Sequence, residues 1–165
     1  MQAVEILDIK NFMQLLFQTN ILDSYEFVSA ELSTDISYSL NGHIHKEFFN
    51  EEETNSIGLT DYDYLPWHLA KEKLFLLIKG KKTPLQLKIV LKACKSQTQD
   101  FLSKTNSSLN SNDIDGIFLN IIFQENKLNV ICGISYKIFT MDKQLESEFS
   151  NSITTLFKSN DIACK

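Results

Sequence analysis

Residues 117–134, IFLNIIFQENKLNVICGI, decide the fold. Two runs rich in β-branched and aromatic residues, Ile117 to Phe123 and Leu128 to Ile134, are separated by the polar residues Gln124 to Lys127. Two such runs joined by a short polar link are typical of a β-hairpin. Because a hairpin joins neighbouring strands without a crossover helix, this stretch predicts an antiparallel sheet.

Working outward, the sequence predicts an amphipathic helix near each end of the chain. Apolar residues recur at helical spacing after Asp8 and after Asp142, two residues suited to cap a helix. The apolar sets are Ile9, Phe12, Met13, Leu16 and Phe17, and then Leu145, Phe149, Ile153, Leu156 and Phe157. We therefore predict an α+β fold in a single domain, residues 1–165. A mainly antiparallel sheet of hairpins carries the two terminal helices on one face, and a flexible loop lies near 105–115.

Two segments in the middle of the chain carry further predictions. Asn41-Gly42 stands between β-like runs, and this dipeptide is the strongest short signal for a hairpin turn. Residues 73–79 contain five consecutive apolar residues, which fit either a buried strand or the end of a helix. We favour the strand.

Composition limits the class of protein and its partners. The chain has 165 residues, 43% hydrophobic and 22% charged, which is typical of a globular protein. Its net charge is −5, and every basic residue is lysine. Since arginine supplies the bidentate fork that reads guanine edges, base-specific recognition of nucleic acid is not expected, although a local basic patch is not excluded.

Cysteine usage and the N-terminus predict a cytoplasmic location. The three cysteines are odd in number and share no C-x-x-C spacing, so we expect free thiols in a reducing compartment. No stretch resembles a signal peptide or reaches the ~20 apolar residues of a membrane span, so no membrane partner is expected.

A candidate metal site follows Gly42. On a strand, His43, His45 and Glu47 would point from one face, and two imidazoles with a carboxylate could begin a zinc or iron site. The alternative interpretation is an ordinary solvated strand face.

Two candidate binding regions lie further along. The turn that contains Lys79, Lys81 and Lys82 could hold a phosphate or a nucleic-acid backbone, but lysines also protect turns and strand edges. Trp67, in an aromatic loop, could anchor a partner or close the core, and we favour the second role. No catalytic motif is present, so the sequence leaves open whether the protein is an enzyme.

The chain also resembles a family of short uncharacterised bacterial proteins, a domain of unknown function. The resemblance rests on Asp8 to Phe12, Asn41-Gly42-His43 with Lys46-Glu47-Phe48, Ile78 to Pro84, and Tyr136 to Lys143. It covers almost the whole chain and implies no activity and no site residue.

The sequence is compatible with three functions. We favour a non-catalytic domain that binds a protein or a small ligand, with a homodimer possible. The first alternative is a metal-dependent enzyme using the histidines and Glu47. The second is a nucleic-acid accessory protein with a sheet like that of sliding clamps and a basic turn at Lys79–Lys82.

Overall fold

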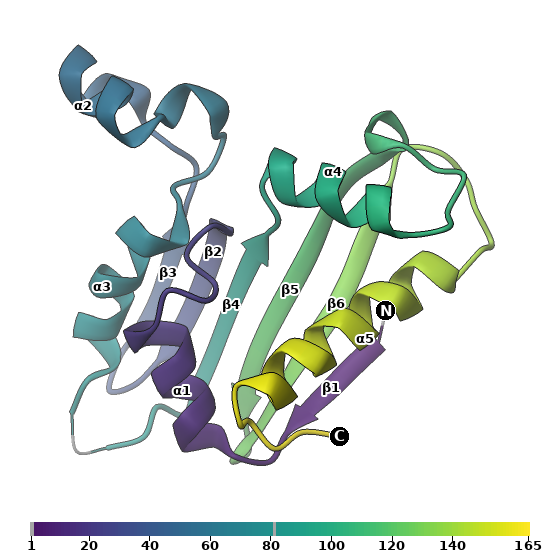
Figure 1. Ribbon diagram of the computed structural model, residues 1–165. Coiled ribbons are helices and arrows are strands. Elements are labelled where there is room, and N and C mark those ends of the chain that lie inside the picture. The colour runs from purple at the N-terminus through teal and green to yellow at the C-terminus, as the bar shows by residue number, and fades with distance from the viewer. Residues whose placement is uncertain (1, 81) are drawn as a thin grey trace.

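The computed structural model describes residues 2–80 and 82–165, and in them the chain forms one six-stranded sheet (Figure 1). The strand order is β1-β6-β5-β4-β2-β3, and every neighbouring pair is antiparallel. The strands are β1 (Gln2–Ile6), β2 (Glu26–Ser33), β3 (Ser37–Asn41), β4 (Gln86–Lys92), β5 (Ile114–Gln124) and β6 (Lys127–Tyr136). The two edges of the sheet are therefore β1 and β3.

Helices cover one face of this sheet. Those described are α1 (Ile9–Gln18), α2 (Glu51–Ile57), α3 (Trp67–Ile78), α4 (Lys95–Lys104) and α5 (Gln144–Ser159), with 3-10 turns η1 (Lys46–Phe48), η2 (Leu59–Asp61) and η3 (Ser111–Asp113). In Figure 1, α1, α3, α4 and α5 lie on the near side of the sheet, and α2 stands apart beyond one end of α3. The predicted α+β fold with helices on one face is confirmed.

The two faces of the sheet differ because side chains alternate along each strand. In β4, Leu87, Ile89 and Leu91 are buried beneath the helices, whereas Lys88 is exposed on the other face. The helices contribute apolar side chains to the same core; Phe12 of α1 and Phe157 of α5 meet edge to face with ring centroids 5.3 Å apart. One layer of helices on one sheet thus accounts for the core.

The hairpin predicted for residues 117–134 is confirmed. β5 and β6 pair from Ile114↔Tyr136 to Gln124↔Lys127. The turn residues Glu125 and Asn126 have φ of 51° and 60°, as a tight hairpin turn requires. The predicted N-cap of the first helix is also present, because the Asp8 side chain accepts the backbone N–H of Asn11 at 3.2 Å.

The hairpin predicted at Asn41-Gly42 is wrong. The observed hairpin turn lies earlier in the chain, at residues 34–36 between β2 and β3. There the N–H of Thr34 donates to the carbonyl of Ile36 at 2.9 Å. After Gly42 the chain does not fold back on β3; His43 instead pairs with Tyr64 in an isolated antiparallel bridge. Gly42 occupies its position for a steric reason, because a Cβ atom there would lie 1.8 Å from the carbonyl oxygen of Phe27.

The strand favoured for residues 73–79 is also wrong, because α3 runs through this segment. Its apolar residues are not all buried, as those of a central strand would be: Leu74 is in the core, while Leu76 is 61% exposed. Trp67, Ala70 and Leu74 form the buried face at helical spacing. Pro66, directly before the first helical residue, fixes a backbone suited to starting this helix.

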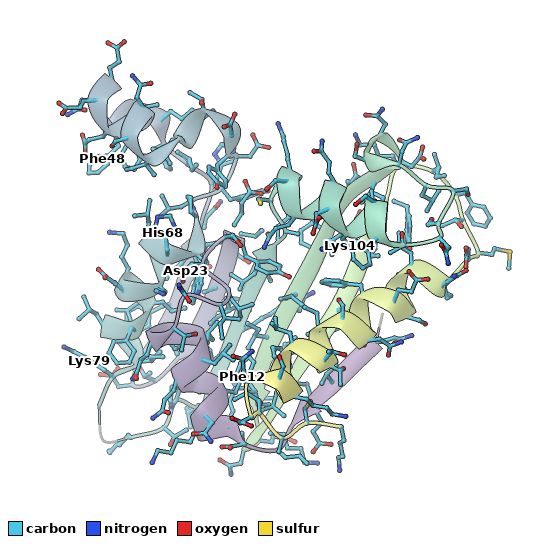
Figure 2. All side chains as sticks on the ribbon, viewed as in Figure 1. Phe12, Asp23, Phe48, His68, Lys79 and Lys104 are labelled. Atoms are coloured by element: carbon cyan, nitrogen blue, oxygen red, sulfur yellow. The ribbon has the colours of Figure 1, made fainter. Side chains whose placement is uncertain are left out.

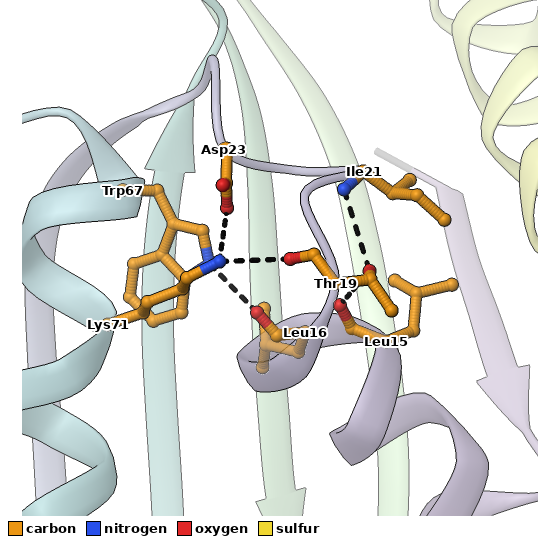
Figure 3. A network of polar contacts seen from close by, with 7 residues as sticks. All are labelled: Leu15, Leu16, Thr19, Ile21, Asp23, Trp67 and Lys71. Atoms are coloured by element: carbon orange, nitrogen blue, oxygen red, sulfur yellow. Dashed lines mark hydrogen bonds and ion pairs between the residues drawn. The ribbon is translucent and has the colours of Figure 1, made fainter.

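Polar contacts fix α3 against α1 (Figure 3). The indole N–H of Trp67 donates to the carbonyl of Leu16 at 3.0 Å. The Lys71 ammonium donates to the carbonyl of Thr19 at 2.9 Å and pairs with Asp23 at 2.6 Å. Both partners of this ion pair are largely shielded from water, so the pair joins α3 firmly to the segment that follows α1.

Candidate binding groove

A groove of about 1050 Å³ lies between α3 and the β3 edge of the sheet. Its sheet side is formed by β3 and the residues that follow it, its helix side by α3, and its end by η1 and α2. The lining residues are Phe27, Ser39, Leu40, Asn41, Gly42, His43, Ile44, His45, Glu47, Phe48, Phe49, Ile57, Leu65, Leu69, Ala70, Lys73 and Leu77.

The lining is mainly apolar. Leu69 and Leu77 project from α3, Leu40 comes from β3, and Ile57 comes from α2. Phe48, which also lines the groove, is 83% exposed and lies beside α2, away from the main body of the protein (Figure 2). An exposed phenylalanine beside a concave apolar surface is typical of a site that buries a ligand or a partner.

Polar side chains lie along the groove. His45 Nδ1 is 3.5 Å from Glu47 Oε1, and the His43 ring meets Tyr64 edge to face with centroids 5.9 Å apart. Lys73 of α3 also lines the groove, and it forms no ion pair with any residue that the structure describes. Lys73 therefore places an ammonium group on the apolar wall of the groove.

The three residues of the candidate metal site, His43, His45 and Glu47, are thus brought to the same groove. They do not share one strand face, because the chain enters η1 at Lys46. Among residues 2–80 and 82–165, no group of three or more His, Cys, Asp or Glu side chains is arranged to hold a metal ion. A metal at this position stays a prediction.

The lysine turn lies elsewhere. Lys79 directly follows α3 (Figure 2), and Lys79 and Lys82 border a hollow of about 490 Å³ that Lys10 of α1 also lines. Lys81 lies outside the described residues. A phosphate or nucleic-acid contact at this turn stays a prediction.

Trp67 points into the core. Its side chain is 0% exposed and lies between Phe17 and Phe27, with ring centroids 5.6 and 5.9 Å away. It therefore presents no surface to a ligand and closes the core, which is the favoured of the two predicted roles.

The apolar wall of the groove was missed because residues 73–79 were interpreted as a strand. The spacing of Trp67, Ala70 and Leu74 carried the signal for a helix, since these positions repeat at three and four residues. Had that helix been recognised, Leu69 and Leu77 would have appeared on a second, lateral apolar stripe.

A buried carboxylate lies behind the groove. Glu26 precedes Phe27 on β2, so its side chain points to the opposite face of the sheet from the groove. It is 6% exposed, and burial raises the pKa of its carboxyl group; hydrogen bonds from the backbone N–H groups of Asp63 and Tyr64 and the charge of Lys92 act in the opposite direction. The pKa of Glu26 is therefore raised on folding, with burial as the largest cause.

We expect this carboxylate to make the protein less stable as the pH rises. A carboxyl group whose pKa is higher in the folded state binds its proton more tightly there. Its favourable contribution is complete below the ordinary pKa of glutamate and is lost as the pH rises through the raised value. The Glu26→Gln variant, which can still accept the Asp63 N–H, should lack this loss and become more stable relative to the wild type between pH 4 and neutrality.

Urea unfolding of both proteins at several pH values measures this difference, with Glu31→Gln as the matched control, because Glu31 is exposed on the same strand. A Glu26→Gln curve parallel to the wild-type curve over the whole range would contradict the prediction.

Burial also affects the thiol of Cys132 on β6, the strand next to the β1 edge. Cys132 of β6 is 0% exposed, and desolvation raises the pKa of its thiol to about 11. Since the thiolate is the nucleophile, Cys132 is a poor candidate for covalent catalysis near neutral pH.

The fold and the groove together define an α+β domain with a one-sided antiparallel sheet and an apolar groove at one sheet edge. A model of the family of unknown function DUF5721 matches residues 14–165. The chain belongs to this family, which confirms the resemblance to a domain of unknown function. No curated protein and no solved structure matches the chain. Within the described residues, no helix is long and apolar enough to cross a membrane.

Proposed function

We propose that this protein is a non-catalytic binding domain whose ligand occupies the groove between α3 and β3. The observation that carries the proposal is the groove itself, about 1050 Å³ lined mainly by apolar side chains. Its few polar groups include Lys73, which has no ion-pair partner in the part of the chain that the structure describes. Ligand sites are typically concave, mostly apolar and supplied with a small number of polar groups that orient the ligand.

Two further features support binding at this place. The groove is built on α3, which the Trp67, Lys71 and Asp23 contacts fix against α1, so its wall is formed before a ligand arrives. A preformed site loses less conformational entropy on binding than one that must order. Phe48 and Phe49 stack edge to face at the far end, with centroids 5.6 Å apart, and add aromatic surface.

The proposal predicts that Leu69→Gln in α3 weakens the binding of an apolar dye, whereas Leu76→Gln on the same helix does not. Leu69 lines the groove and is half-buried, so Leu69→Gln replaces apolar lining by an amide. We expect about a fivefold or larger loss of affinity for anilinonaphthalene sulfonate, a dye that fluoresces in apolar surroundings. Fluorescence titration measures the loss.

Leu76→Gln is the matched control. It makes the same change on the same helix, but Leu76 is largely exposed and does not line the groove. Its affinity for the dye should stay within about twofold of wild type. The proposal fails if the wild type does not bind the dye or if both variants lose affinity equally.

A further inference from the structure

The two edge strands of the sheet, β1 and β3, differ in the backbone hydrogen bonds that their outer sides make. At β1, the backbone of Glu5 exchanges hydrogen bonds with Lys165 at 2.8 and 3.0 Å, and the N–H of Leu7 donates to Ala163 at 2.8 Å. Residues 163–165 therefore cover the C-terminal end of that edge, from Glu5 onward. At β3 no described segment does the same between Ser37 and Asn41.

The pairing of β3 with β2 shows which backbone groups remain outside. In an antiparallel pair, residues alternate between those that bond the partner strand and those that face away from it. The carbonyl of Ile36 accepts from Thr34, and the N–H of Gly42 donates to Val28 at 2.8 Å. Tyr38 and Leu40 lie two and four residues after Ile36, so their backbone groups also hydrogen-bond to β2. The backbone N–H and C=O groups of the residues between them therefore point away from the sheet. Those intervening residues are Ser37, Ser39 and Asn41.

This open edge borders the groove, because Ser39, Leu40 and Asn41 also line it. Exposed edges are usually protected by charged side chains, proline or a covering segment, since they recruit other strands. The outward-facing residues of β3 carry neither charge nor proline. An extended peptide on this edge would form main-chain hydrogen bonds to β3 and direct alternate side chains into the groove.

We propose that the occupant of the groove is an extended peptide segment of a partner protein, which adds to β3 as a further strand. The segment has apolar residues at alternate positions and one acidic residue that faces Lys73. The negative charge of the peptide is inferred from Lys73, which lines the groove without an ion pair among the described residues. Glu47, the acidic residue of the lining, already lies beside His45. This inference rests on the proposed function and specifies its ligand.

A second copy of this chain fits the groove less well. If two copies paired through β3, the side chains at the shared edge would include Tyr38 and Leu40 of each. Both side chains already pack against the core of their own molecule, so they cannot also fill the groove of another. A peptide without a core of its own has no such conflict.

The first experiment selects displayed random heptapeptides on the immobilised protein. We expect enrichment of sequences with alternating apolar residues and an Asp or Glu, and depletion of proline. A synthetic peptide of the selected sequence should bind about tenfold more weakly when one central amide is N-methylated, because a main-chain hydrogen bond is lost and the methyl group obstructs pairing. No enrichment, or no effect of N-methylation at any central position, overturns the inference.

Matched variants of the protein locate the peptide. Ser39→Pro removes the outward N–H and should weaken binding about tenfold, whereas Ser39→Ala removes only the hydroxyl and should leave affinity within about twofold. Lys73→Glu should reverse the preference, so that a peptide with Lys in place of its acidic residue binds about threefold better than the acidic one. If Ser39→Pro does not fold, the N-methylated peptides with the wild-type protein test the same hydrogen bonds.

The outcomes separate this inference from the proposed function. Dye binding that depends on Leu69 without any peptide selection would keep the groove as a site and overturn strand addition. A concentration-dependent dimer that Ser39→Pro abolishes would identify a second copy as the occupant and likewise overturn it. Absence of both dye and peptide binding would contradict both proposals.

Discussion

Replacing Trp67 by alanine should destabilise the protein by about 3–5 kcal/mol, because it empties the largest fully buried position of the core. The indole lies against Phe17 and Phe27, and its N–H is the donor to the carbonyl of Leu16. Alanine removes the apolar contacts and also leaves that buried carbonyl without its donor, which adds a separate cost of about 1–3 kcal/mol where water cannot enter. Since folded domains are stable by only about 5–15 kcal/mol, the variant should be near the limit of folding.

Trp67→Phe separates the two contributions. It keeps much of the apolar volume but not the N–H donor, so we expect a loss of about 1–3 kcal/mol. Urea unfolding followed by circular dichroism measures both variants; tryptophan fluorescence cannot, because Trp67 is the only tryptophan in the chain. A cost below about 1 kcal/mol for Trp67→Ala would show that this side chain does not hold α3 against α1, and the groove wall would lose its support.

The parts of the fold that the sequence predicted correctly are those with local causes. The β5–β6 hairpin depends on two apolar runs and the short polar link between them, and the cap of α1 depends on Asp8 and the N–H three residues later. Both are contained in a short window of sequence. The pattern of apolar residues in α1 and α5 is likewise local, and it correctly placed these helices on one face of the sheet.

The errors occurred where contacts distant in sequence decide the structure. In α3, five consecutive apolar residues suit a buried strand, but this segment meets α1 on one side only, so Phe75 and Leu76 can remain partly or largely exposed. The open edge of β3 could not be foreseen either, because it depends on the strand order and on which segments reach each edge. The candidate groove was therefore seen only in part, through His43, His45 and Glu47.

Gly42 shows how a residue that is typical of a hairpin turn can be required for a different physical reason. Asn41-Gly42 predicted a turn that needs positive φ, yet Gly42 is not among the residues with positive φ. A Cβ atom at Gly42 would lie 1.8 Å from the carbonyl oxygen of Phe27, where no side chain can fit. The close approach exists because the N–H of Gly42 donates to Val28 at 2.8 Å while its carbonyl accepts from Leu65 at 2.9 Å.

Gly42→Ala should therefore destabilise the protein by about 3 kcal/mol or more, since relief of the clash requires the backbone to move and at least one of these hydrogen bonds to lengthen. Gly58→Ala is the matched control: nothing lies within 4 Å of its Cβ position, and only its φ of 74° at the end of α2 favours glycine. The control should cost about 1 kcal/mol. Urea unfolding measures the free energy of unfolding of both variants. It compares the cost of a steric clash at Gly42 with the cost of a positive φ at Gly58.

The same substitution also tests how the groove is built, because Gly42 joins β3 to the residues that carry His43 and His45. A displaced backbone at Gly42 should weaken dye binding in the folded fraction of Gly42→Ala, whereas Gly58→Ala, outside the lining, should bind as the wild type does. If Gly42→Ala costs no more than Gly58→Ala, β3 and the residues after it can move away from Phe27 at little cost. The β3 side of the groove would then be free to adjust to its ligand.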